Sequence, residues 1–275
     1  MQGCPLRCQW CSNPESFHSG PQLMARDSKC ILCGKCAAVC PRGAIMVDKT
    51  SGRKIDRSKC DLCLLCALAC PTGSLSVSGQ YMTVHEILEE IGKDELFYSN
   101  SGGGVTISGG EPLMQAEFVA SLLQECRRRS IHMALETAGH MPREKLELVL
   151  PHINLLLFDI KHLDSEKHKQ GTGKGNELIL DNLRYAAAKV KTWLRLPLIP
   201  GFNDSDDNLL EMARLGLKLA IDKISLLPYH KLGRQKYTYL GVIYVIDSLN
   251  EPSREYVENR ANFLKSCGMN VTVGN

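Results

Sequence analysis

Three closely spaced cysteines near the start of the chain are the residues best suited to chemistry. Cys4, Cys8 and Cys11 form a C-x3-C-x2-C pattern. Three thiolates at this spacing can bind three irons of a four-iron, four-sulfur cube and leave the fourth iron without a protein ligand. An iron with an open position can bind a small molecule and act on it, whereas a structural site closes itself with four ligands. The alternative is a zinc site in which His18 is the fourth ligand.

The other cysteines are also grouped. The chain holds 13 cysteines in 275 residues, and eleven of them fall in three tight groups before residue 71. A secreted disulfide scaffold would explain the cysteine content, but not the grouping or the long remainder with the pattern of an α/β domain. We therefore interpret the groups as metal ligands. Cys126 and Cys267 lie alone in predicted helices, and we expect them to be small core side chains.

The second and third groups form an internal repeat. Each reads C-x2-C-x2-C-x3-C-P and is followed by a small-residue turn and a short predicted strand, within residues 42–47 and 72–77. This repeat resembles the bacterial two-cluster ferredoxin module, in which the fourth cysteine of each run binds the other cluster. The resemblance implies an α+β insert at residues 28–77 with two 4Fe-4S clusters, one held by Cys30, Cys33, Cys36 and Cys70 and the other by Cys60, Cys63, Cys66 and Cys40. Two zinc ribbons are the alternative, but they would not need a proline after the fourth cysteine.

The chain after the insert alternates between predicted helices and strands. Thr83 and Glu86 fit the N-cap and capping-box positions of the first helix. Strand patterns follow at 105–108, 132–136, 155–161, 192–197, 223–227 and 270–273, and helical patterns lie between them at 116–130, 143–150, 182–190, 206–218 and 254–267. Repeating βα units imply an α/β fold with a parallel sheet and right-handed crossovers. Residues 1–27 and 78–275 are predicted to form this core domain, with residues 12–28 as polar loop.

The bulk composition excludes some classes of partner. The net charge is +3, from 33 basic and 30 acidic residues. This balance favours neither nucleic acid nor a membrane as the main partner. No apolar run reaches about 18 residues, so no transmembrane helix is predicted. No signal peptide is predicted before Cys4, and we expect a cytoplasmic location.

Polar residues stand at or near the ends of five predicted strands. In parallel α/β folds the site lies at the carboxyl ends of the strands. Any one of these polar side chains could simply be exposed to solvent at the end of its strand. Five such strand ends on the same edge of the sheet favour a binding site. The candidates are Gly109, Gly110, Glu111, Glu136, Thr137, Asp159, Ile160, Lys161, Arg195 and His230.

Two motifs in this sequence resemble those of the radical S-adenosylmethionine (SAM) superfamily. They are the cysteine motif, with Trp10 before its last cysteine, and the SGGEP segment at residues 108–112. The longer run GCPLRCQWCSNPES, residues 3–16, resembles activating enzymes of glycyl radical enzymes, of the pyruvate formate-lyase activating type. The resemblance covers nearly the whole chain and implies a partial barrel of six βα units. In related enzymes a first strand precedes the cysteine motif, whereas three residues precede it here, so we expect the barrel to lack that strand and to expose its neighbour as an edge.

The resemblance also implies a reaction. The open iron of the Cys4, Cys8 and Cys11 cluster would bind SAM, and the reduced cluster would cleave it to methionine and a 5′-deoxyadenosyl radical. That radical would abstract hydrogen from a glycine of a partner glycyl radical enzyme, as part of anaerobic metabolism. A flavodoxin or ferredoxin would donate the electrons. The insert clusters would relay them or help to dock the partner.

The resemblance gives each candidate residue an expected role. Gly109 and Gly110 would let the backbone approach the methionine end of SAM. Glu111 would accept from its ammonium group or orient the loop. Lys161 and Arg195 would pair with its carboxylate or hold nearby acids. Adenine and ribose contacts are expected from His230 and from the backbone of Trp10, Cys11 and Ser12.

A monovalent cation near the SAM carboxylate is a further implication. Its ligands would be Glu136, Thr137, the Leu157 carbonyl and Asp159. The alternative is a salt-bridge network in which Glu136 and Asp159 pair with Lys161.

Two other functions are kept as alternatives. One is a radical SAM enzyme that acts on a different peptide or on a small molecule. The other is a purely electron-transferring iron–sulfur protein, which the ferredoxin-type repeat alone would suggest. The latter leaves the three-cysteine motif and the charged strand ends unexplained.

Overall fold

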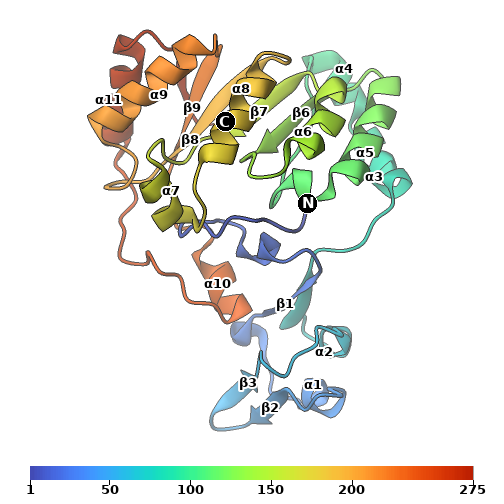
Figure 1. Cartoon of the computed structure of the whole chain (residues 1–275). Coiled ribbons are helices and arrows are strands. Elements are labelled where there is room, and N and C mark those ends of the chain that lie inside the picture. The colour runs from blue at the N-terminus through green and yellow to red at the C-terminus, as the bar shows by residue number, and fades with distance from the viewer. Residues whose placement is uncertain (275) are drawn as a thin grey trace.

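The structure, a computed structural model, describes residues 1–274 and contains a large core above a small module (Figure 1). The core holds a six-stranded sheet in the order β10-β9-β8-β7-β6-β5, and every neighbouring pair is parallel. The strands are β5 (Gly104–Ile107), β6 (His132–Thr137), β7 (Leu155–Asp159), β8 (Thr192–Leu198), β9 (Lys223–Pro228) and β10 (Val271–Val273). The predicted parallel sheet is confirmed. It is open, with β5 and β10 as its edges.

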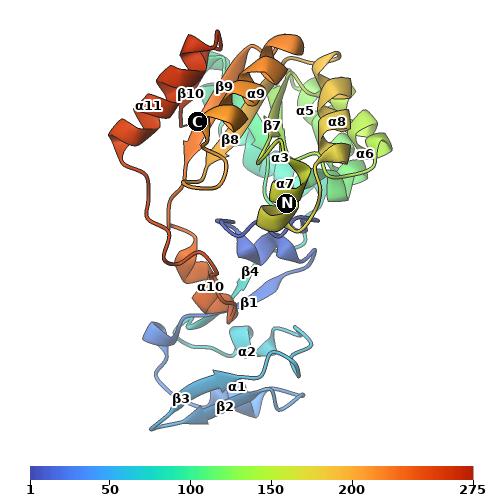
Figure 2. The ribbon, with the colours of Figure 1, turned by 60° about the vertical axis from the view of Figure 1, so that its left-hand side comes forward.

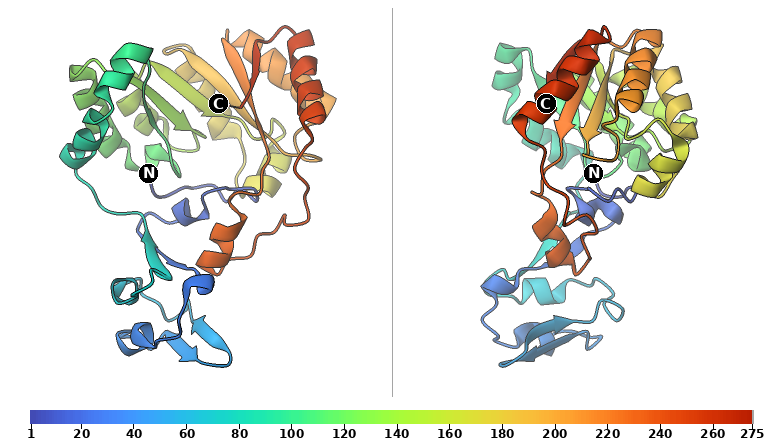
Figure 3. Two further views of the ribbon diagram at one scale, coloured as in Figure 1. Left: turned by 180° about the vertical axis from the view of Figure 1, so that it is seen from behind. Right: turned by 90° about the vertical axis from the view of Figure 1, so that its left-hand side faces the viewer.

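Most of the helices connect the strands and pack on the sheet, whereas α10 lies apart from it (Figures 1 and 3). They are α3 (Val84–Gly92), α4 (Glu95–Ser101), α5 (Ala116–Arg128), α6 (Arg143–Val149), α7 (Ser165–Thr172), α8 (Glu177–Ala187), α9 (Asp206–Lys218), α10 (Arg234–Leu240) and α11 (Arg254–Ser266). The capping box at Thr83 and Glu86 is confirmed. The sequence did not predict α4, α7 and α10. Helix α4 buries no residue and α7 buries only His168, Gly171 and Thr172, so neither has an apolar face that a helical period would reveal. Helix α10 packs against segments that are distant in the chain.

The core is apolar where the strands and helices meet. Leu156, Phe158, Leu194 and Leu196 are fully buried in the central strands, as near-continuous apolar runs in parallel strands predict. Cys126 is fully buried in α5, and Cys267 is partly buried against the same core. Both solitary cysteines therefore act as small hydrophobic side chains, as predicted.

The module contains the repeated cysteine runs and two strand pairs, one of which includes a strand that lies before the predicted start of the insert at residue 28. Strand β2 (Ile45–Asp48) pairs with β3 (Gly52–Ile55), and β1 (Gln22–Ala25) pairs with β4 (Leu75–Ser78), both antiparallel. The first three cysteines of each run precede or lie in a one-turn helix, α1 (Lys35–Ala38) or α2 (Leu65–Leu68). The prediction of loop throughout residues 12–28 is wrong at β1, because this four-residue strand gains its partner β4 only through tertiary pairing. Helix α2 lies closer to the core than α1 does (Figure 2).

The first residues and α10 lie between the core and the module (Figures 1 and 3). Helix α10 packs against β1 and against the short 3₁₀ helix η1 (Pro14–Phe17). Arg57 of the module donates to the carbonyls of Leu23, at 2.9 Å, and Tyr239, at 3.0 Å. This arginine therefore fastens the module to α10. Within residues 1–274, no helix has the length and apolarity to cross a membrane.

Candidate functional site

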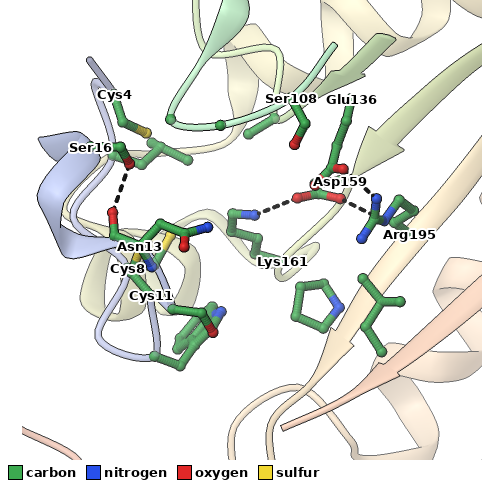
Figure 4. Close-up of a pocket in the computed structure, with 18 of the residues that line it drawn as sticks. Cys4, Cys8, Cys11, Asn13, Ser16, Ser108, Glu136, Asp159, Lys161 and Arg195 are labelled. Carbon is green, nitrogen blue, oxygen red and sulfur yellow. Dashed lines mark hydrogen bonds and ion pairs between the residues drawn. The ribbon is translucent and has the colours of Figure 1, made fainter. Parts of the chain in front are cut away.

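The loop that carries Cys4, Cys8 and Cys11 crosses the carboxyl ends of the strands. All three cysteines line one cavity of about 280 Å³ between the loop and the sheet (Figure 4). Most of the site residues predicted from the sequence line the same cavity, namely Trp10, Ser12, Gly109, Gly110, Glu136, Thr137, Asp159, Lys161, Arg195 and His230. The fold thus brings residues from distant segments together around the three thiols.

Two predicted site residues do not line this cavity. Glu111 is 1% exposed, and its carboxylate accepts from the Thr137 hydroxyl at 2.6 Å and from the backbone of Leu113 and Ala138. Burial raises its pKa, and these hydrogen bonds oppose the rise. Of its two predicted roles, the geometry favours orienting the loop. The side chain of Ile160 lies in the apolar core instead.

Charged side chains at the sheet form a paired network (Figure 4). The Lys161 ammonium lies 3.1 Å from Asp159, and the Arg195 guanidinium lies 2.6 Å from Glu136 and 3.6 Å from Asp159. These contacts support a salt-bridge network over a cation site. The predicted pairing with Lys161 is found for Asp159, whereas Glu136 pairs with Arg195 instead.

The network shifts the pKa of its members. Burial lowers the pKa of Lys161, but the Asp159 carboxylate and the nearby Cys8 outweigh burial, and the net shift is upward. Burial and Asp159 raise the pKa of Glu136, and Arg195 opposes this rise. Lys161 is therefore a fixed positive charge beside the three thiols, while the charge on Glu136 depends on Arg195.

The glycines of the SGGEP segment allow close backbone packing. The Gly110 N–H donates to the Met1 carbonyl at 2.8 Å, and the Glu111 N–H donates to the Gly3 carbonyl at 2.6 Å. A Cβ on Gly109 would lie 2.3 Å from the Met1 oxygen, and a Cβ on Gly110 would lie 2.2 Å from the Gly3 oxygen. The sequence suggested close approach to a ligand. In the structure these glycines line the cavity and also admit the start of the chain.

Side chains of α10 hold the cysteine loop from the far end of the sequence. The Tyr237 hydroxyl donates to the Cys11 carbonyl at 3.0 Å. The Lys236 ammonium lies 2.7 Å from the Asn13 side-chain oxygen and 2.6 Å from Glu15. Sequence reasoning missed these residues, because α10 was not predicted and nothing local connects it to the loop.

The backbone of the loop is also tied to the core. The Arg7 N–H donates to the Thr172 carbonyl at 2.7 Å, and the Gln9 N–H donates to the Gly171 carbonyl at 3.0 Å. A Cβ on Gly171 would lie 3.0 Å from the Trp10 ring, so α7 and the loop are in close contact. Helix α7, which was not predicted, therefore fixes the position of the cysteines.

The donor set fits a cluster with an open iron. Burial raises the pKa of Cys4 to about 11 and that of Cys8 to about 12, so both thiols must release a proton when they bind metal. His18, the fourth ligand of the zinc alternative, is exposed and does not line the cavity. Across residues 1–274, no three His, Cys, Asp or Glu side chains are arranged to hold a single metal ion.

In the module, the last cysteine of the second run lies beside the first three of the first run. Cys70, from the second run, lines a small cavity with Cys30, Cys33 and Cys36, from the first. The sulfur of Cys70 accepts from the Leu75 N–H at 3.3 Å. At the corresponding position of the first run, the sulfur of Cys40 accepts from the Ala44 N–H at 3.3 Å.

The second run is packed beside the first. Cys66 is buried with Cys36, and Cys40, Cys60 and Cys70 pack against the same apolar cluster. Cys33 and Cys63 are exposed. The donor set at the first cavity, four thiols from two runs, fits a closed four-cysteine site.

The match to a known family agrees with this geometry. Residues 1–213 match the Radical SAM superfamily, so the chain belongs to that superfamily. This stretch includes the cysteine loop, the module and the strands from β5 to β8.

Two relatives of the chain are named as activating enzymes. The chain is 42% identical over 247 residues to an isethionate sulfite-lyase activating enzyme of Nitratidesulfovibrio vulgaris, covering 87% of this chain and 80% of that protein. It is 42% identical over 288 residues to a (2S)-3-sulfopropanediol dehydratase activating enzyme of Klebsiella oxytoca, covering 100% and 90%. A solved domain of a pyruvate-formate lyase-activating enzyme from Bacteroides vulgatus is 34% identical, with a TM-score of 0.53, and covers 63% of this chain and 99% of that one.

Proposed function

We propose that this protein activates a glycyl radical enzyme by generating a radical from SAM. The observation that carries the proposal is the cavity in which three cysteines of one loop face Lys161, Asp159 and Arg195. A purely electron-transferring protein has no need for such a cavity. The names of the relatives, all activating enzymes in the two comparisons above, favour a protein partner over the alternative of a small-molecule substrate.

The proposal includes three 4Fe-4S clusters, one at the cavity and two in the module. Cys4, Cys8 and Cys11 would hold the first through three of its irons. When bound and reduced, such a cluster would supply one electron to SAM, which would yield methionine and a 5′-deoxyadenosyl radical. The position of Cys70 beside the first run supports a ferredoxin-type module. The open six-stranded sheet supports a partial (β/α)6 barrel.

The chain's own residues would bind SAM and protect the radical. Lys161, whose pKa is raised, keeps a positive charge at the cavity for a carboxylate ligand. His230 and the loop backbone at Ser12 line the same cavity and would contact ribose or adenine. Trp10 lines the cavity and packs against Phe202, with ring centroids 4.9 Å apart, and would help to shield this wall from water.

The pairing of two candidate ligands argues against the monovalent cation that the family resemblance implies. Its candidate ligands Glu136 and Asp159 are already paired with Arg195 and Lys161. We propose the site without that cation. A flavodoxin or ferredoxin would be the electron donor. The protein would act in the cytoplasm.

Anaerobic reconstitution tests the function. The chain is loaded with iron and sulfide, reduced and given SAM, and 5′-deoxyadenosine is quantified beside iron content. We expect about twelve irons per chain, three cubes of four, and formation of 5′-deoxyadenosine. Isethionate sulfite-lyase and (2S)-3-sulfopropanediol dehydratase are then the first two partners to assay for a glycyl radical by electron paramagnetic resonance (EPR). A fully loaded chain that forms no 5′-deoxyadenosine would contradict the proposal.

A variant of the cysteine loop is the matched control. Cys8→Ala removes one ligand at the cavity and leaves both runs of the module unchanged. We expect about eight irons to remain and 5′-deoxyadenosine to disappear. Full activity of this variant would mean that the reaction takes place elsewhere in the chain.

A further inference from the structure

Arg53 is a buried cation in the module. It lies on β3, and its side chain is 2% exposed. It lines the same small cavity as Cys30, Cys33, Cys36 and Cys70. A charge removed from water must be compensated, and its N–H groups must find acceptors.

The hydrogen-bond partners of Arg53 satisfy only some of its N–H donors and compensate only part of its charge. Nη2 donates to Asp27 at 2.6 Å, and Nη1 donates to the Ser74 hydroxyl at 2.9 Å. The Nε–H is buried and has no hydrogen-bond partner among the described residues. Asp27 is 72% exposed, so its carboxylate is largely solvated and compensates the buried charge weakly. The guanidinium is therefore left with a free donor and much of its charge at a cavity of four thiols.

We propose that Arg53 raises the reduction potential of the cluster held by Cys30, Cys33, Cys36 and Cys70. This inference rests on the proposed function, which assigns a 4Fe-4S cluster to these four ligands. Such a cluster with four thiolates is an anion, and one-electron reduction adds a further negative charge. A nearby cation and an N–H···S hydrogen bond stabilise the reduced form more than the oxidised form.

The location of this cluster explains why a raised reduction potential would be useful there. The run Cys30–Cys36 leads into α1, which lies farther from the core than α2 does (Figure 2). Three of the four ligands beside Arg53 belong to this run, and the site is called the outer one for that reason. A low-potential one-electron carrier that reaches the module loses one electron, and the outer cluster gains it. By stabilising the reduced cluster, Arg53 makes this outer site the better electron acceptor.

The neighbouring residue provides a matched control. Lys54 lies next to Arg53 on β3, but its side chain is exposed and does not line the cavity. Lys54→Met and Arg53→Met each remove one positive charge from the same strand. Arg53→Lys keeps the charge and loses the planar fork that bonds Asp27 and Ser74.

An EPR-monitored redox titration of the complete, reconstituted chain tests the inference. In Arg53→Met we expect one midpoint potential to fall and the others to stay in place. In Arg53→Lys we expect a smaller fall, and in Lys54→Met no change. Iron content and far-ultraviolet circular dichroism are measured on each sample to show that all clusters and the fold are retained.

Several outcomes would overturn the inference. Unchanged midpoints in a fully loaded Arg53→Met would leave Arg53 as a structural link between Asp27 and Ser74. If Arg53→Met binds only about eight irons, the midpoints are measured in fully loaded Arg53→Gln, which also lacks the positive charge, and unchanged values there would overturn the inference. A wild-type chain with only about four irons would refute the cluster assignment itself. Because no step of the titration requires SAM or a partner enzyme, failure of glycyl radical formation leaves a shifted midpoint valid.

Discussion

The pairing of Arg195 with Glu136 and Asp159 allows a quantitative test of the charge network. In Arg195→Met the two carboxylates remain, and Asp159 keeps its contact with Lys161. Glu136 loses the ion pair at 2.6 Å. We therefore expect Glu136 to be the destabilised member.

The expected loss of stability follows from the burial of Glu136 and Arg195. Removal of one partner from a fully buried ion pair costs about 3–5 kcal/mol. The Glu136 side chain is 26% exposed and that of Arg195 is 12% exposed, so water recovers part of this loss. We expect a loss of about 2–3 kcal/mol in the free energy of unfolding, which for a chain near this size lowers the melting temperature by about 4–12 °C.

The effect should also depend on pH. The pKa of Glu136 is already above its ordinary 4.5, because of burial first and Asp159 second, and loss of Arg195 raises it further. A carboxyl group with a raised pKa in the folded state favours folding when protonated, and that contribution is lost as pH rises through the folded-state value. The deficit of Arg195→Met should therefore be larger at about pH 8 than at about pH 5.

Anaerobic thermal unfolding of the reconstituted variants, at one scan rate and two pH values, is the assay. Glu136→Gln added to Arg195→Met should recover most of the lost stability and remove its pH dependence. Arg184→Met is the control, since its exposed pair with Asp181 is worth at most about 1 kcal/mol. If Arg195→Met melts like the wild type at both pH values, the carboxylates are hydrated and the network argument is wrong.

Three further substitutions address the cysteine loop and the cavity. In Gly233→Ala the new Cβ would lie 2.6 Å from the Ser12 backbone and push α10 away, so we expect loss of about four irons, measured as iron per chain. Tyr237→Phe deletes the hydrogen bond to the Cys11 carbonyl, worth about 1 kcal/mol, and should speed the bleaching of the cluster in visible absorbance. Lys161→Met removes an ammonium group that remains protonated at neutral pH because its pKa is raised. The affinity for SAM, measured by calorimetry, should fall about 10- to 100-fold.

A specific result would contradict each of these predictions. Gly20→Ala is the control for the first, since its nearest atom would be the Tyr81 hydroxyl at 3.6 Å, and equal iron in both glycine variants would contradict the steric argument. Bleaching of Tyr237→Phe at the wild-type rate would mean that α10 does not steady the loop. Wild-type affinity in Lys161→Met would place the SAM carboxylate elsewhere.

The sequence determined the chemistry of the site and the order of the elements. The spacing of Cys4, Cys8 and Cys11 limits them to a compact, three-thiol site before any folding is considered. The alternation of apolar and polar segments predicted all six strands of the parallel sheet, because buried parallel strands require nearly continuous apolar runs. The capping box at Thr83 and Glu86 was also readable, since its hydrogen bonds are local.

Tertiary structure decided how those residues are held. Helices α4 and α7 have no apolar face that the sequence would reveal, and β1 and α10 are stabilised by partners distant in the chain. The contact of Tyr237 with the Cys11 carbonyl spans 226 positions and leaves no local pattern.

Roles within the site were also decided by the fold. Glu111 and Asp159 are both acids near strand ends, yet the first turns inward to the Thr137 hydroxyl and the second faces the cavity. The burial of Arg53 against four cysteines is likewise invisible in its own strand sequence. Residue type and spacing fix which groups are available, because they are local properties. Burial and pairing depend on contacts between distant segments, and these determine which group is charged, bonded or free to bind.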